Sequence, residues 1–182
     1  MLRGPNELLE LDPRSGLSPP ADVEWELIAN LHLPLSTPDD VKKYFEVLQT
    51  LCLYGRYQYM FYSVAYLLSF FLLELALVAR LKDKKRTKRD SLQSLLREAK
   101  KRGLLKDEKF SGGQWRKIRA EYREQETGTV SNLHPYVELL EGSLRNLRGS
   151  AAHPTYIPTL PPHYALSQLR LCSELICQLW TD

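Results

Sequence analysis

The chain has 182 residues, the length of a single domain and enough to bury an ordinary hydrophobic core. Its 25 basic and 22 acidic residues give a formal net charge of +3, so overall charge alone does not predict strong nucleic-acid binding. The three cysteines lie in apolar stretches with helical spacing. They predict buried, reduced thiols in a cytoplasmic protein and argue against a disulfide framework (Cys52, Cys172 and Cys177).

The N-terminal part of the sequence predicts an arm followed by a helical domain. Residues 1–22 contain Pro, Gly and Ser and end in SGLSPPAD, which predicts a flexible or loosely docked arm before a domain over residues 23–182. MLRGPNELLELD has no apolar segment, so we expect no signal peptide. VEWELIANLHL predicts a short helix or an extended surface segment. At STPDD a helix start follows, where Thr37 can cap and Pro38 suits the first turn, and Gly55 predicts the break after this helix.

The longest apolar run is YQYMFYSVAYLLSFFLLELALVARL, which has no charged residue from Tyr57 to Leu73. Its length approaches the roughly 20 residues of a membrane helix, and the basic stretch after it would suit a cytoplasmic anchor. Two serines (Ser63 and Ser69) and several tyrosines interrupt the run, and Glu74 lies near its end. We therefore expect a central helix buried in a soluble bundle, so that membrane association is not favoured.

The second half of the chain predicts further helices. DSLQSLLREAKKRGLL predicts a helix capped by Asp90 or Ser91 and ended by Gly103, with leucines on its buried face. QWRKIRAEYREQ predicts a short amphipathic helix with its basic residues outside and three apolar residues inward (Trp115, Ile118 and Tyr122).

A helix from Pro135 and a last helix ending near Trp180 complete the set, with no competing strand pattern. The last helix should face inward through Ala165, Leu169, Cys172, Ile176 and Leu179. The predicted fold is all-α, a bundle of four to six helices.

The sequence RNLRGSAAHP contains the residues most suggestive of chemistry. Arg148 follows Val137 by eleven residues, about three helical turns, so it continues the apolar stripe of its helix. A buried arginine needs a partner, and the lone acid Glu74 has the same need, so a Glu74–Arg148 pair is a reasonable hypothesis. His153 precedes Pro154, which disfavours helical backbone at the histidine and places it at or beyond a helix end.

This arrangement resembles the HEPN superfamily, small all-α proteins whose signature is an arginine, four to six residues, and then a histidine. LRNLRGSAAH matches that signature with Arg148 and His153. AYLLSFFLLELAL looks like the family's long second helix, and LLREAKKRGLL looks like its middle helix. The resemblance covers roughly residues 38–180. Gly149 departs from the family pattern, which often has a polar residue there, whereas the dipeptide Arg145–Asn146 stands three residues earlier.

The resemblance implies a metal-independent endoribonuclease of the toxin or antiviral-defence type, with no cofactor. In the implied mechanism His153 is the general base for a ribose 2′-OH, Arg148 stabilises charge at phosphorus, and Glu74 orients Arg148. The implied partners are RNA, a second copy of the chain that completes a shared cleft, and an antitoxin or defence-system protein. The residues expected to hold RNA are Lys84, Lys85, Arg86, Lys88, Arg89, Arg116, Lys117, Arg119, Arg145 and Asn146.

Two alternatives stay open. Gly149 favours a non-catalytic HEPN-like module that binds nucleotide or RNA, or that dimerises as a regulator. Residues 57–81 could instead anchor an interaction protein in a membrane. The sequence contains no cluster of His, Cys or carboxylate residues at metal-ligand spacing, and no P-loop or dinucleotide-binding glycine motif.

Overall fold

The computed structural model describes residues 10–81, 91–127, 135–141 and 159–181. The described residues form helices joined by loops and turns, with no strand among them, which confirms the predicted all-α bundle. Residues 136–141 are also helical. The elements are η2 (Pro13–Leu17), α1 (Ala21–Ala29), α2 (Asp39–Tyr54), α3 (Met60–Arg80), α4 (Leu92–Lys101), η3 (Asp107–Lys109), α5 (Ser111–Thr127) and α7 (Pro162–Trp180).

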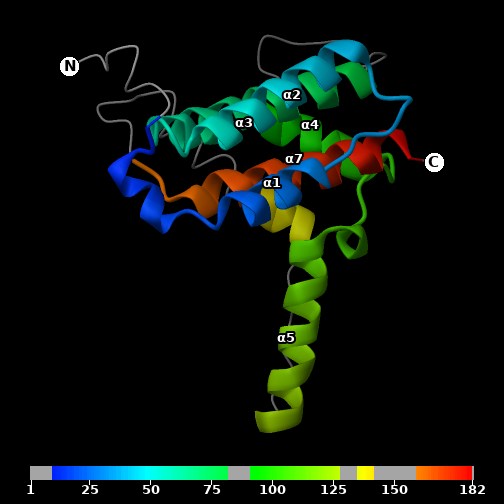
Figure 1. The fold of residues 1–182 in the computed structure, drawn as a ribbon. Helices are drawn as coiled ribbons and strands as arrows, with labels where there is room; N and C mark the ends of the chain where they lie inside the picture. The colour runs from blue at the N-terminus through cyan, green and yellow to red at the C-terminus, as the bar shows by residue number, and fades with distance from the viewer. Residues whose placement is uncertain (1–9, 82–90, 128–134, 142–158, 182) are drawn as a thin grey trace.

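The bundle is built around α3, which packs against α7, α2 and α4. In Figure 1, α2 and α3 lie along one side of the bundle and α1 and α7 along the other. The helix α5 leaves the bundle near α1 and α7 and projects away from it. In the described part of the chain, α1, α2, α3, α4 and α7 therefore form the body of the bundle, and α5 protrudes from it.

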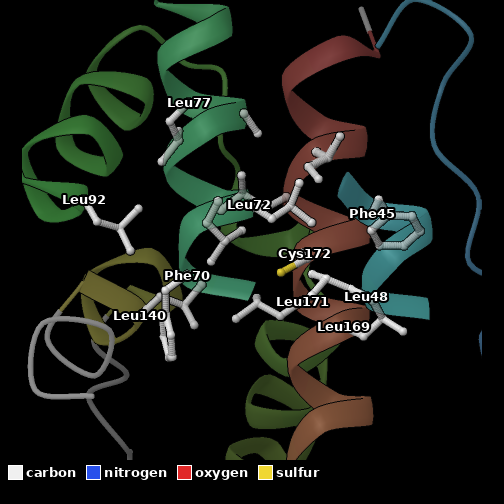
Figure 2. Packing of buried hydrophobic residues seen from close by; sticks show 14 of the residues in the cluster. Phe45, Leu48, Phe70, Leu72, Leu77, Leu92, Leu140, Leu169, Leu171 and Cys172 are labelled. Carbon is white, nitrogen blue, oxygen red and sulfur yellow. The ribbon is translucent and has the colours of Figure 1, made fainter. Parts of the chain in front are cut away.

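Apolar residues on nearly every side of α3 make it the centre of the core. Leu72, Leu73, Ala76 and Leu77 are fully buried, and Figure 2 shows the packing of α3 side chains with those of α2, α4 and α7. Among the described helices, α3 is also the one long and apolar enough to span a membrane, and half of its most apolar stretch is buried. The core helix of a soluble protein has the same length and composition.

The predicted ends of α2 are confirmed in part. Gly55 follows the last residue of the helix, as expected. A side chain at this glycine would collide with the ring of Tyr62, since its Cβ would lie 2.6 Å from that ring. The capping prediction at Thr37 is wrong, because Pro38 occupies the N-cap position and no side chain bonds to the first turn. The Thr37 hydroxyl is instead buried.

The predicted ends of α4 are correct. Ser91 caps the helix by accepting a hydrogen bond from the Ser94 amide, and Gly103 adopts the left-handed conformation (φ 71°) that ends it. The predicted inward stripe of α7 is entirely buried, and so are the predicted apolar residues of α4 (Leu92, Leu95, Leu96 and Ala99). Strict helical spacing with leucine-rich composition was enough to identify these two faces.

Part of the predicted flexible arm is docked on the bundle. Residues 1–9 lie outside the described part of the chain, but the Asp12 amide donates to the Arg56 carbonyl over 2.8 Å, and Asp12 is only 4% exposed. The Pro, Gly and Ser content of this segment correctly predicts irregular backbone. It carries no information on what the backbone rests against. Of the two predicted alternatives, a flexible or a loosely docked arm, the contacts of Asp12 agree with the docked one. The boundary between arm and domain stays a prediction.

Candidate functional site

Most of the predicted site falls outside the described residues. Arg145, Asn146, Arg148 and His153 lie in the segment 142–158. Five other residues predicted to hold RNA lie in the segment 82–90 (Lys84, Lys85, Arg86, Lys88 and Arg89). The structure therefore does not test the proposed Glu74–Arg148 pair. It does describe Glu74 and the points where the chain enters and leaves the motif segment. It also describes the three α5 residues predicted to hold RNA, of which Arg116 is half-buried and Lys117 and Arg119 are exposed.

Glu74 lies on α3 and is half-buried. The motif segment begins beside α4, because Gln93 Nε2 donates to Glu141 Oε1 over 2.7 Å and Arg97 forms an ion pair with the same carboxylate. It ends on α3, where the Leu160 amide donates to Ser63 Oγ over 3.0 Å. Both ends of the Arg148–His153 segment are thus fixed to α3 or to the helix packed beside it.

The prediction that the apolar residues of α5 face inward is wrong. Trp115 is 71% exposed and Ile118 is 56% exposed, because α5 projects from the bundle (Figure 1). The side chain of Tyr122 lies outside the described part of the structure. Lys117 and Arg119 are exposed, as predicted. Helical periodicity shows which residues share a face of α5, but not whether that face meets another helix.

The base of α5 is fixed by hydrogen bonds to its neighbours. The Ser111 amide, at the start of the helix, donates to Glu174 Oε2 of α7 over 3.2 Å. The Val137 amide donates to Asp107 Oδ1 over 3.0 Å and joins the following helical stretch to the same base. The carboxylate of Glu174 also suits the positive end of the α5 dipole. These hydrogen bonds therefore fix the first turn of α5 to α7 and to the helical stretch that begins after Pro135.

Two glycines permit this close packing at the root. A Cβ atom on Gly113 would overlap the backbone carbonyl oxygen of Asp107, and one on Gly112 would overlap the side chain of Tyr136. The Tyr136 ring also packs against Phe110 at a centroid distance of 5.4 Å. Glycine is required at both positions because neighbouring atoms already occupy the space of a methyl group.

A groove of about 420 Å³ lies between α1, α7 and the root of α5. Leu27 and Leu166 contribute apolar walls, and the exposed Trp115 stands at the α5 side. Arg170 and His163 from α7 provide its basic groups. An exposed indole beside a guanidinium and an imidazole can stack on a planar ring and contact an anionic group.

A buried polar network joins α1 to the turn between α2 and α3. Glu24 is fully buried and accepts hydrogen bonds from Tyr62 Oη (2.6 Å) and from Arg56 Nη1 (3.1 Å). Arg56 also donates to the Pro19 carbonyl over 2.7 Å. Burial raises the pKa of Glu24 above its usual value, although the bonds from Tyr62 and Arg56 oppose the shift. Burial and the bond to Glu24 also raise the pKa of Tyr62, so the proton stays on the phenol.

A second carboxylate fixes the docked N-terminal segment. Asp12 accepts hydrogen bonds from the Arg14 side chain (2.9 Å) and from the Tyr59 amide (3.3 Å). Arg14 lies over the Tyr59 ring, 4.9 Å from its centroid. The bonds from Arg14 hold the pKa of Asp12 well below its usual range, against the opposing effect of burial. These contacts are structural, because each group is occupied by another part of the same chain.

The sequence reasoning missed both carboxylate clusters. Glu24 occurs in VEWELIANLHL, where nothing distinguishes it from Glu26, and its partners Arg56 and Tyr62 are more than thirty positions away. The one available signal was Ile28, four residues after Glu24 and therefore on the same face of a helix. An acid on the apolar face of a short helix predicts a buried partner.

The described residues contain no group of three or more His, Cys, Asp or Glu side chains that could hold a metal ion. The thiols are also unsuited to nucleophilic chemistry. Cys52 and Cys172 are buried as predicted, Cys177 is half-buried, and burial raises the pKa of Cys52 to about 12. Such a thiol stays protonated at neutral pH.

No family model, curated protein or solved structure matches the chain.

Proposed function

We propose that the chain is a metal-independent endoribonuclease that cleaves RNA at Arg148 and His153. The observation that supports the proposal is where the chain enters and leaves the motif segment. It begins at Glu141, bonded to α4, and it ends at Leu160, bonded to α3. The acid implied for the site, Glu74, is on α3 as well. The chemistry of the proposal comes from the resemblance of the sequence to the HEPN superfamily.

The reaction is an internal transesterification. His153 accepts the proton of a ribose 2′-OH, and the 2′-oxygen attacks the adjacent phosphorus while the bond to the 5′-oxygen breaks. The leaving 5′-oxygen takes a proton from a second imidazole, His153 of another copy. Arg148 stabilises the negative charge on the phosphoryl oxygens, because its guanidinium offers paired donors. The products are a 2′,3′-cyclic phosphate and a 5′-hydroxyl. Imidazole suits both proton transfers, since its ordinary pKa is about 6.5.

In this proposal α5 contacts the RNA backbone. Lys117 and Arg119 are exposed on the projecting helix, and neither forms an ion pair within the described part of the chain. Free cations beside an exposed tryptophan suit single-stranded nucleic acid, because the cations meet phosphates and the ring stacks on a base. Replacing Lys117 and Arg119 with alanine should weaken binding to all RNA sequences alike and reduce the salt dependence of binding.

The test is cleavage of a mixed-sequence, single-stranded RNA in excess EDTA, followed by analysis of the product ends. We expect 2′,3′-cyclic phosphate and 5′-hydroxyl ends, and no cleavage of the same sequence with 2′-O-methyl ribose. Cleavage that stops in EDTA, or that leaves 5′-phosphate ends, would contradict the transesterification mechanism.

A second candidate function is RNA or nucleotide binding without cleavage. The groove at the root of α5 favours it, because Trp115, Arg170 and His163 provide a binding surface that needs no catalytic group. Tight RNA binding by the intact chain with no product over long incubation would support this second function over the first.

A further inference from the structure

An apolar stripe of α3 faces outward, away from α7. Val64, Leu68, Phe71 and Leu75 recur at intervals of four, three and four residues, so they share one face of the helix. Phe71 is 57% exposed, and the other three are only partly buried. A large exposed phenylalanine in the middle of an apolar stripe costs solvation free energy unless something covers it.

A second stripe lies on the neighbouring helix α2. Tyr44, Val47, Leu51 and Tyr54 recur at intervals of three, four and three residues. Val47 is 50% exposed and Tyr54 is 51% exposed, although α2 has a separate buried face that supplies the core. The helix is therefore apolar on two sides. This chain covers the first side fully and the second only in part, because Tyr44 and Leu51 pack against the edge of the core while Val47 and Tyr54 are exposed.

The two stripes adjoin. On α2, Gln49 donates hydrogen bonds to the carbonyls of Ile28 and Leu31 and so marks the flank that faces α1. At 100° per residue, the α2 stripe lies about 180° around the helix from Gln49, on the side away from α1. On α3, Leu77 lies on the side that faces Leu92 of α4 (Figure 2). The helix α2 also packs against α3, and it lies on the other side, next to the α3 stripe. We name the combined surface the α2–α3 face.

We propose that the α2–α3 face binds a second copy of this chain by two-fold self-association. The eight residues of the two stripes carry no charge, so a two-fold pairing brings apolar side chains together without burying an ion. The edges are polar: Lys43 and Thr50 are exposed beside the α2 stripe, and Glu74 lies three residues after Phe71. An uncharged centre with a polar rim is the usual composition of a protein interface.

The size of the face is comparable with that of a dimer interface. The 16 residues of α2 extend about 24 Å at about 1.5 Å per residue, and two adjacent helices are about 20 Å wide. Their projected area is therefore about 480 Å², which is of the same order as the ~800 Å² of accessible surface that each partner buries in a standard interface. Pairing α2 and α3 with their copies would also form a four-helix layer, a common bundle arrangement.

The role of this interface rests on the proposed function, because cleavage needs two copies of the chain. One chain has one motif histidine, whereas the reaction uses a base and an acid. Glu74, the acid implied for the cleavage site, borders the α2–α3 face. Self-association there would place two copies of this carboxylate at the rims of one interface.

The test is sedimentation equilibrium of the full chain without RNA, over a range of protein concentrations. We expect a dimer for the wild type and at least a tenfold weaker self-association for Phe71→Glu. Val47→Glu provides a second variant on the other helix, in case the first does not fold. Leu35→Glu is the matched control, since Leu35 is 96% exposed and lies outside both stripes. Circular dichroism checks the fold of each variant.

A monomeric wild type, or a dimer that neither face variant weakens, would overturn the proposal. A monomer that floats with phosphatidylcholine vesicles, and no longer floats as Phe71→Glu, would assign the face to a membrane instead. His153→Ala should remain a dimer. An inactive but dimeric wild type would therefore count against the cleavage reaction and not against the interface.

Discussion

Replacing Glu24 with alanine should lower the free energy of unfolding by about 3 kcal/mol. Removing one partner of a buried ion pair costs about 3–5 kcal/mol, because the other charge stays desolvated. Here the remaining charge is Arg56, whose side chain is 17% exposed and keeps its hydrogen bond to the Pro19 carbonyl. This residual solvation places the expected cost at the lower end of the range. Tyr62 Oη also loses its short bond to the carboxylate, but it keeps Ser18 Oγ at 3.2 Å.

The measurement is urea unfolding at pH 7, followed by tryptophan fluorescence and far-UV circular dichroism. Glu26→Ala is the control, because Glu26 is exposed on the same helix and its loss should change stability by less than about 0.5 kcal/mol. Glu24→Gln keeps an acceptor for Tyr62 and should cost less than Glu24→Ala. A change of under 1 kcal/mol for Glu24→Ala would refute the idea that this network holds α1 to the bundle.

Three further predictions concern other parts of the chain. Gly113→Ala should destabilise the fold by about 1–3 kcal/mol, because the methyl group overlaps the Asp107 carbonyl; an unchanged thermal melt would contradict this. Asp12 has a depressed pKa when folded, so it stabilises the fold above its ordinary pKa, and that contribution is lost as the pH falls. The stability of Asp12→Asn should therefore depend less on pH than wild type between about pH 5 and pH 2 in acid titrations of unfolding. A double-mutant cycle of Glu74→Ala and Arg148→Met should give a coupling of about 0.5–3 kcal/mol in urea unfolding, and zero coupling would remove the pair from the proposed site.

The parts of the fold that depend on local pattern could be predicted from the sequence. Helical spacing gave the buried faces of α4 and α7, and Ser91, Gly55 and Gly103 marked helix ends through their local backbone preferences. These features were predictable because each depends on residues within a few positions of one another. The cap at Thr37 failed for a local reason, since a proline took the cap position itself.

The parts that depend on distant contacts could not be predicted. The stripe of Trp115 and Ile118 looks like the inward face of any amphipathic helix, and only the position of α5 outside the bundle exposes it. The docking of Asp12 and the burial of Glu24 depend on residues 55–62, which no short-range pattern connects to them. The candidate site itself rests on the Arg148–His153 motif. The motif lies outside the described residues, and the structure shows only where the chain enters and leaves its segment, at Glu141 and Leu160.

The most direct test of the proposed function compares wild type, His153→Ala and His32→Ala on one labelled RNA in EDTA. His32 is an exposed histidine in the loop between α1 and α2, so its replacement controls for the loss of an imidazole. We predict that His32→Ala cleaves like wild type. His153→Ala should keep the wild-type melting temperature and RNA affinity but cleave about 10²–10⁴-fold more slowly, as expected for loss of a general base. Equal cleavage rates for His153→Ala and wild type would contradict the assignment of the catalytic site.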